Sequence, residues 1–152
     1  MNQLFAAKIQ AVVEQYSELL TAPLIAMRGG PSHSTGGGIY VLYDNGQPVH
    51  VGRTRNLRRR LQGHCSESHY HASFAFKRAR IETGRKADYR AGNSRGALAQ
   101  SPDFRPTFLR QVQAIRAMQY RFLAVSDPVE QYLLELYAAM ELGTSMDEFD
   151  TH

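Results

Sequence analysis

Apolar residues recur at helical spacing over residues 2–21, and this pattern predicts an amphipathic helix at the start of the chain. Its apolar positions are Leu4, Phe5, Ile9, Val12, Val13, Tyr16 and Leu20. A helix of this kind packs its apolar face against other elements, so we expect it to support the core. Residues 28–38 (RGGPSHSTGGG) follow, and their content of Gly, Ser and Pro predicts a linker.

A β-hairpin is predicted next. Apolar runs at residues 38–44 and 47–53 flank Asn45 and Gly46, a pair that is typical of hairpin turns. A loop of only these two residues would set Val41 opposite His50 and scatter the apolar residues over both faces.

A loop over residues 44–46 gives a cleaner register. Val41 then pairs with Val49. Ile39 likewise pairs with Val51, and the apolar residues share one face. We therefore expect the three-residue loop.

The opposite face of this hairpin carries two titratable rings. The expected register sets Tyr40 directly across from His50, with Gly52 beside them. These side chains contribute nothing to an apolar core, which is unusual for a hairpin with a purely structural role. They are the first candidates for chemistry.

The rest of the chain contains further predicted elements. They are helices at residues 55–65, 72–81, 104–118 and 128–142, and a third strand at residues 119–126. The last helix begins with Asp127 as its cap, Pro128 at the first helical position and Glu130 at the third. This order predicts a small α/β (α+β) domain with a three-stranded, mainly antiparallel sheet flanked by helices.

We place that domain at residues 38–152. An amino-terminal helix and linker at residues 1–37 precede it, and a basic insertion occupies about residues 65–105.

The helix at residues 55–65 carries an unusual run of arginines. Leu57 and Leu61 are expected to face the core, and Arg58 and Arg59 turn away from it. Two other side chains border the buried side instead. At about 100° per residue, Arg60 returns to within about 60° of Leu57 and His64 to within about 20°.

Composition narrows the class of protein. A chain of 152 residues with 43% apolar residues fits one compact domain, and its single cysteine, Cys65, excludes an internal disulfide. No apolar run reaches the length of about 18 residues that a membrane-spanning helix needs. We expect a soluble, cytoplasmic protein with no membrane partner.

The net charge of +4 hides an asymmetry along the chain. Residues 53–95 carry twelve Lys and Arg against three acids, whereas residues 127–150 carry seven acids and no Lys or Arg. The basic segment is either a surface for a polyanion or a solvated loop. The candidate phosphate contacts are Arg53, Arg55, Arg58, Arg59, Lys77, Arg78, Arg85, Lys86 and Arg90.

An ordered series of motifs runs through the domain. It consists of Gly38-Ile39-Tyr40, then His50-Val51-Gly52, then Arg60 with His64, and finally Glu130 on the last helix. Over residues 38–142 this series closely resembles the GIY-YIG nuclease family. The resemblance implies an endonuclease that hydrolyses phosphodiester bonds with the help of one divalent metal ion.

The resemblance also implies a role for each matching residue. Tyr40 positions or deprotonates the attacking water, Arg60 binds the scissile phosphate and His64 follows it one turn on. Glu130 would bind one Mg²⁺ or Mn²⁺ ion per active site. A single carboxylate suits Mg²⁺, because this ion keeps most of its water ligands and is also coordinated by phosphate oxygens of the substrate.

The chain departs from the family pattern at two positions. His50 stands where the second motif usually has a tyrosine, and the asparagine that often follows the last helix is absent, with Asp147 the nearest polar residue. An imidazole is mostly neutral near pH 7 and accepts a proton more readily than a phenol of pKa about 10. His50 therefore belongs with the candidate catalytic residues.

Structural explanations stay open for these residues. Tyr40 is also a plausible strand residue, and Asp127 and Glu130 satisfy a capping box without any metal. A zinc site at His64, Cys65, His69 and His71 matches no common spacing.

The sequence thus predicts a metal-dependent endonuclease with DNA favoured as its substrate. The alternatives are a catalytically inactive nucleic-acid-binding module and an RNA-directed nuclease. A homo-oligomer also stays open, because so short a chain has no separate domain for reading a sequence.

Overall fold

The computed structural model describes residues 1–28 and 36–149. The chain divides into two compact units, which we call unit 1 (Met1–Arg58 and Met118–His152) and unit 2 (Arg59–Ala117). Most of the linker predicted at residues 28–38 lies outside the described residues.

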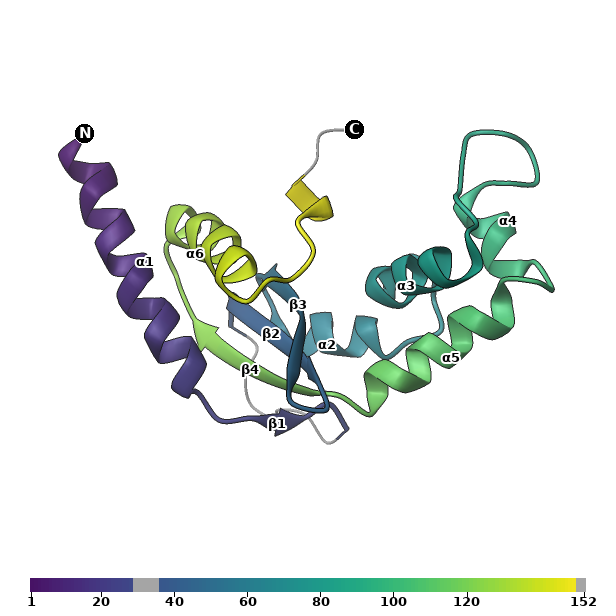
Figure 1. The fold of residues 1–152 in the computed structure, drawn as a ribbon, viewed down its shortest axis with the longest axis horizontal. Helices are drawn as coiled ribbons and strands as arrows, with labels where there is room; N and C mark the ends of the chain where they lie inside the picture. Colours follow the sequence, from purple (N-terminus) through teal and green to yellow (C-terminus); the bar gives the residue numbers. More distant parts are fainter. Residues whose placement is uncertain (29–35, 150–152) are drawn as a thin grey trace. The chain divides into compact units, whose positions relative to one another are not determined.

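A four-stranded antiparallel sheet forms the centre of unit 1 (Figure 1). Its strands are β1 (Ile25–Ala26), β2 (Gly38–Asp44), β3 (Gln47–Thr54) and β4 (Gln119–Ala124), in the order β1-β4-β2-β3. The predicted α/β class is confirmed, but the expected number of three strands is wrong. The additional strand β1 is two residues long, too short to show any alternation of polar and apolar residues in the sequence.

The helices agree closely with the predicted ones. They are α1 (Gln3–Thr21), α2 (Leu57–His64), α3 (Ser73–Thr83), α4 (Arg95–Gln100), α5 (Arg105–Arg116), α6 (Pro128–Glu141) and a 3₁₀ turn, η1 (Asp147–Phe149). Only α4 and η1 were not expected, and both are too short for a periodic pattern. Ser94 caps α4, since its hydroxyl accepts from the backbone N–H of Ala97 at 3.2 Å.

The register of the hairpin differs from the predicted one. Asp44 pairs with Gln47, so the loop holds only Asn45 and Gly46, both at positive φ (50° and 81°). Positive φ at both central residues is the signature of a tight type I′ turn. The expected loop over residues 44–46 is therefore wrong.

A bulge explains how a two-residue loop still leaves one apolar face. The register shifts between Leu42 and Tyr43, so that Tyr43 pairs with Pro48 whereas Leu42 pairs with His50. Val49 is the extra residue, and it follows a proline that has no N–H for the ladder. Val41 consequently pairs with Val51 rather than with Val49.

The same shift moves the two titratable rings. Tyr40 pairs directly with Gly52, and His50 pairs with Leu42. Because neighbours two apart on a strand share a face, Tyr40 and His50 still lie on one face, as diagonal neighbours. The shared face is confirmed, and the direct pairing is wrong.

The core of unit 1 lies between the other face of the sheet and helices α1 and α6. It contains Val12, Leu19, Ile39, Val41, Tyr43, Val51, Val125, Leu134, Ala138 and Ala139. Tyr16 on α1 packs edge-on against Tyr137 on α6, with ring centroids 5.2 Å apart.

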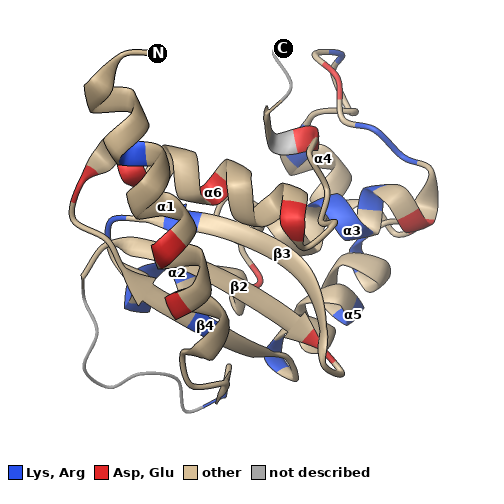
Figure 2. Ribbon diagram, turned by 60° about the vertical axis from the view of Figure 1, so that its left-hand side comes forward, with Lys and Arg blue, Asp and Glu red and all other residues tan. Residues whose placement is uncertain are grey.

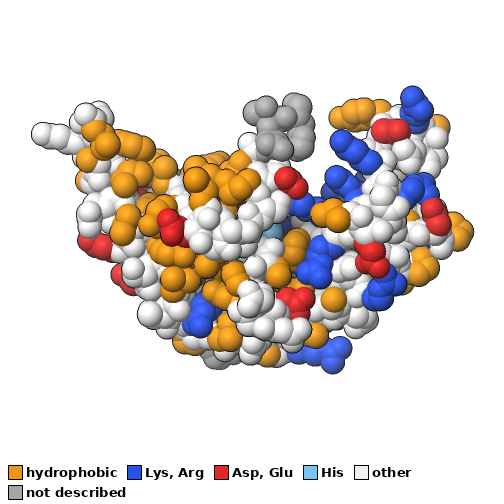
Figure 3. Space-filling view, viewed as in Figure 1, with side chains coloured by type: hydrophobic (Ala, Val, Ile, Leu, Met, Phe, Trp, Pro, Cys, Tyr) orange, Lys and Arg blue, Asp and Glu red, His pale blue; other side chains and the backbone are white. Residues whose placement is uncertain are grey.

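Helix α1 supports this core with only part of its apolar face. Val12 and Leu19 are buried, whereas Leu4 is 68% exposed and Phe5 46% exposed. Figure 3 shows hydrophobic side chains at the surface along α1. Helix α1 therefore supports the core, as expected, but with only some of its apolar positions.

Unit 2 has a core of its own, built on aromatic packing between α3 and α5. The ring of Phe76 lies 5.0 Å from that of Phe104 and 5.9 Å from that of Phe108, measured between centroids. Rings at these separations stabilise each other beyond the area they bury.

None of the helices formed by residues 1–28 and 36–149 is long and apolar enough to cross a membrane.

Replacing Gly38 should test the pairing of β2 with β4. A Cβ atom there would lie 2.0 Å from the backbone oxygen of Leu123, so the strands would have to separate. We expect Gly38→Ala to lower the free energy of unfolding by roughly 1–3 kcal/mol or more. Urea unfolding followed by circular dichroism measures this.

Gly36→Ala is the matched control, because a Cβ at Gly36 meets no atom within 4 Å. Equal stability of the two variants would contradict the role given to Gly38.

Candidate active site

Tyr40 on β2 and His50 on β3 form a buried pair of polar rings. Tyr40 is 0% exposed and His50 5% exposed. The hydroxyl of Tyr40 lies 3.4 Å from Nε2 of His50, and the ring planes are inclined at 50°. Depending on the tautomer of the imidazole, the hydroxyl donates to Nε2 or accepts from it. The pair can therefore pass a proton between a phenol and an imidazole.

Gly52 makes room for this pair. A Cβ atom at Gly52 would lie 2.3 Å from both Cζ and the hydroxyl oxygen of Tyr40. The ring of Tyr40 thus occupies the space that any other side chain at position 52 would need. The glycine of the second motif is required here by close approach of the Tyr40 ring.

Tyr120 on β4 is a residue of the same face that the sequence alone did not reveal. It pairs with Leu42, which also pairs with His50 on the other side of β2. Tyr120 is fully buried, and its hydroxyl has no hydrogen-bond partner among the described residues. Burial raises the pKa of Tyr120. Strand alternation points to this residue only once the order β4-β2-β3 is known.

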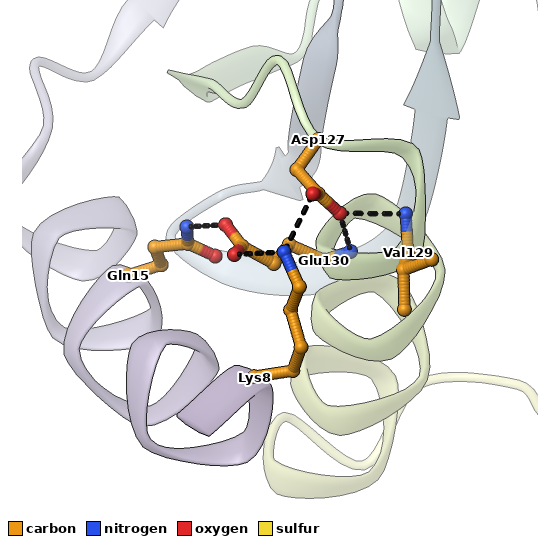
Figure 4. A network of polar contacts seen from close by, with 5 residues as sticks. All are labelled: Lys8, Gln15, Asp127, Val129 and Glu130. Carbon is orange, nitrogen blue, oxygen red and sulfur yellow. Dashed lines mark hydrogen bonds and ion pairs between the residues drawn. The ribbon is translucent and has the colours of Figure 1, made fainter. Parts of the chain in front are cut away.

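Glu130 lies on α6 and is held by helix α1 (Figure 4). Lys8 donates from Nζ to Oε1 of Glu130 at 2.9 Å, and Gln15 donates from Nε2 to Oε2 at 2.7 Å. The side chain of Glu130 is 17% exposed and that of Lys8 is 22% exposed. Both carboxylate oxygens therefore have a donor, in a partly buried ion pair.

Asp127 joins this network and also caps α6. Its Oδ1 accepts from the backbone N–H groups of Val129 and Glu130, each at 2.9 Å, and its Oδ2 accepts from Lys8 at 2.5 Å. The predicted capping by Asp127 is confirmed. The hydrogen bond from Lys8 lowers the pKa of Asp127, and the hydrogen bonds to Asp127 and Glu130 raise the pKa of Lys8.

This arrangement does not bring Glu130 to Tyr40 and His50. Helix α6 packs on the sheet face that carries Ile39 and Val41, whereas Tyr40 and His50 lie on the other face. Among residues 1–28 and 36–149, no three His, Cys, Asp or Glu side chains gather into a metal-binding group. With an ammonium group on one oxygen and an amide on the other, Glu130 does not fit a metal ligand as it stands.

Arg60 and His64 lie on α2, in the part of this helix that belongs to unit 2. His64 is fully buried, with its ring edge-on to Phe74 at a centroid distance of 6.3 Å. Arg60 is half-buried and donates from Nη2 to the hydroxyl of Ser73 at 3.5 Å. Both therefore border the buried side of α2, as their helical positions predict.

The basic side chains that are candidates for phosphate contact differ in their own contacts within the protein. Arg53 donates from Nε to Glu135 at 3.3 Å, and its guanidinium carbon lies 3.5 Å from the ring centroid of Tyr132. Arg55 borders a cavity of about 510 Å³ in unit 1. Arg78 donates to Gln111 at 2.7 Å.

The remaining basic candidates lie mostly at the surface. Arg85 pairs with Asp103, and Lys77 is half-buried. The exposed ones are Arg58, Arg59, Lys86 and Arg90. Figure 2 shows Lys and Arg along α3 and on the segment that follows it. The basic insertion thus presents charge to solvent, as either a polyanion surface or a solvated loop would.

Comparisons of the chain with protein-family models, curated proteins and solved structures return no match. The resemblance to GIY-YIG nucleases stays a prediction.

The contribution of Asp127 to stability should depend on pH. Because its pKa is lowered from 3.8, its ionised form stabilises the fold above that pH, and the stabilisation is lost as the pH falls through the folded-state value. Asp127→Asn keeps a capping oxygen but no charge. We expect its melting temperature to fall less than that of the wild type between about pH 5 and pH 2.

Asp127→Ala removes the capping oxygen as well as the charge, so it should be less stable than Asp127→Asn at every pH. Parallel pH curves for the wild type and Asp127→Asn would contradict the assigned ion pair.

Proposed function

We propose that this protein hydrolyses phosphodiester bonds in nucleic acid, with DNA as the favoured substrate, and that Tyr40 and His50 are its proton-transfer pair. The observation that carries the proposal is the 3.4 Å contact between the Tyr40 hydroxyl and Nε2 of His50. It supports the roles that the resemblance implies for the first and second motifs.

Hydrolysis requires a base for the attacking water. In the proposed step, Nε2 of His50 accepts a proton that water releases, either directly or through the Tyr40 hydroxyl. The water oxygen then forms a bond to phosphorus as the bond to the leaving oxygen breaks. The resemblance assigns phosphate binding to Arg60, whose guanidinium is a planar fork of donors that suits phosphate oxygens.

A metal ion enters this proposal only through the resemblance. A Mg²⁺ ion would neutralise charge on the phosphate. Glu130 has the right chemistry for it, but Lys8 and Gln15 hold both of its oxygens. The proton transfer assigned to Tyr40 and His50 does not pass through a metal.

The alternative is a nucleic-acid-binding module without catalysis. Two observations favour it: Glu130 is neutralised by Lys8, and the Tyr40 and His50 rings are both buried. Such a module would bind nucleic acid in a salt-sensitive way and cleave nothing under any metal.

A cleavage assay separates the two functions. Purified protein is incubated with single-stranded DNA, duplex DNA and RNA, each with EDTA, Mg²⁺ or Mn²⁺. We expect cleavage of DNA by the wild type, and a loss of about 100-fold or more in Tyr40→Phe, because the variant lacks the hydroxyl that exchanges a proton with His50. Arg60→Ala should lose cleavage to a similar extent.

Tyr137→Phe is the matched control, because Tyr137 packs with Tyr16 in the opposite layer of unit 1. Full activity in Tyr40→Phe would refute the role of the pair. His50→Tyr restores the usual residue of the second motif, and raised activity would show that the histidine is not the working base.

Lys8 provides a separate test of a metal on Glu130. If a cation competes with the Lys8 ammonium for this carboxylate, Lys8→Met should lower the Mg²⁺ concentration that gives half-maximal cleavage, and Glu130→Gln should raise it. Equal Mg²⁺ midpoints in the wild type and Lys8→Met would exclude Glu130 as the ligand.

A further inference from the structure

Two arginines and a histidine lie near one another in unit 2, and none of them belongs to the proposed catalytic pair. Arg80 lies on α3, Arg95 is the first residue of α4, and His69 lies in the turn before α3. Arg95 donates from Nε to the backbone oxygen of His69 at 2.8 Å. Its guanidinium carbon lies 4.4 Å from the ring centroid of Phe76, one helical turn before Arg80.

These charges have no counter-ion within the described part of the chain. Two acids near α3 and α5 form ion pairs with other arginines: Asp103 pairs with Arg85, and Glu82 pairs with Arg110. Within residues 1–28 and 36–149, neither Arg80 nor Arg95 pairs with a carboxylate. Burial and the nearby charge of Arg80 both lower the pKa of Arg95, burial being the larger cause.

Buried side-chain nitrogens in the cluster have no hydrogen-bond partner among the described residues. They are Nε of Arg80, Nη2 of Arg95 and Nε2 of His69. A buried donor without an acceptor is costly, and two neighbouring cations without an anion are more so. A single bound oxyanion would remove both costs.

The contacts of Arg95 hold its guanidinium in place for such an anion. Phe76 holds the guanidinium plane of Arg95 on one side, and the bond to His69 fixes its Nε edge. The imidazole edge of His69 lies near the start of α4, since a Cβ atom at Gly96 would lie 3.5 Å from Nε2. Guanidinium groups bind phosphate oxygens through paired N–H donors, so the remaining donors of Arg95 and Arg80 match a phosphate.

We propose that Arg80, Arg95 and His69 form an oxyanion site that binds a backbone phosphate of nucleic acid. The site includes neither Tyr40 nor His50, and its assignment to nucleic acid rests on the proposed function, in either its hydrolytic or its binding form. Free phosphate has the same chemistry. The surrounding surface favours a polymer, because Lys and Arg recur around α3 and α4 (Figure 3).

Thermal unfolding tests the anion site itself. Inorganic phosphate, compared with chloride at equal ionic strength, should raise the melting temperature of the wild type and of Arg110→Gln. Arg80→Gln should show no such rise. In chloride Arg80→Gln should melt no lower than the wild type, because Nε of Arg80 makes no hydrogen bond to the described residues and the charge of Arg80 opposes that of Arg95. An equal rise in Arg80→Gln would overturn the site.

Binding of a fluorescent oligonucleotide tests the polymer. Each phosphate contact contributes about 0.7–0.9 to the slope of log affinity against log salt concentration. Arg80→Gln should therefore lower the slope by about one contact relative to Arg110→Gln, which loses an equal charge from α5 of the same unit. An unchanged slope, with phosphate still stabilising the wild type, would make this a free-anion site and overturn the nucleic-acid assignment.

The two proposals can fail independently. A change in slope without cleavage by the wild type supports this site and refutes hydrolysis. Cleavage with equal slopes supports hydrolysis and refutes the assignment of this site to nucleic acid.

Discussion

The absence of a side chain at two glycines allows the close packing of the sheet in unit 1. At Gly38 the carbonyl of Leu123 takes the space of a side chain, and at Gly52 the ring of Tyr40 does so. The first contact allows β4 to pair with β2. The second brings the Tyr40 hydroxyl within reach of His50. The glycines of both motifs therefore have a steric explanation that is independent of any catalytic role.

Charge is distributed in opposite ways in the two units. In unit 1, Lys8 satisfies Asp127 and Glu130, so the acidic start of α6 is neutralised from within the chain. In unit 2, Arg80 and Arg95 are close together with no carboxylate partner among the described residues. A protein gains little from burying like charges unless something outside the chain compensates them. This contrast favours unit 2 as the part of the protein that binds an anionic ligand.

Much of the fold could be predicted from local patterns. The helices of residues 3–21, 105–116 and 128–141 carry clear periodicity or caps, and the structure bears them out. The hairpin was predicted correctly but its register was not, since a bulge at Val49 compensates for the shorter loop. A bulge depends on the pairing of two strands, which a single strand's sequence does not encode.

In the candidate site, too, the local interactions could be predicted from the sequence and the long-range contacts could not. By itself the sequence determined that Tyr40, His50 and Gly52 share a face, because side chains alternate strictly along strands. It also determined that Asp127 caps the last helix, which is a local interaction. Only the tertiary structure decided that Glu130 pairs with Lys8, more than a hundred residues away, and that Tyr120 joins the face of Tyr40. Those contacts depend on how helices pack and on the order of strands, and no local spacing carries that information.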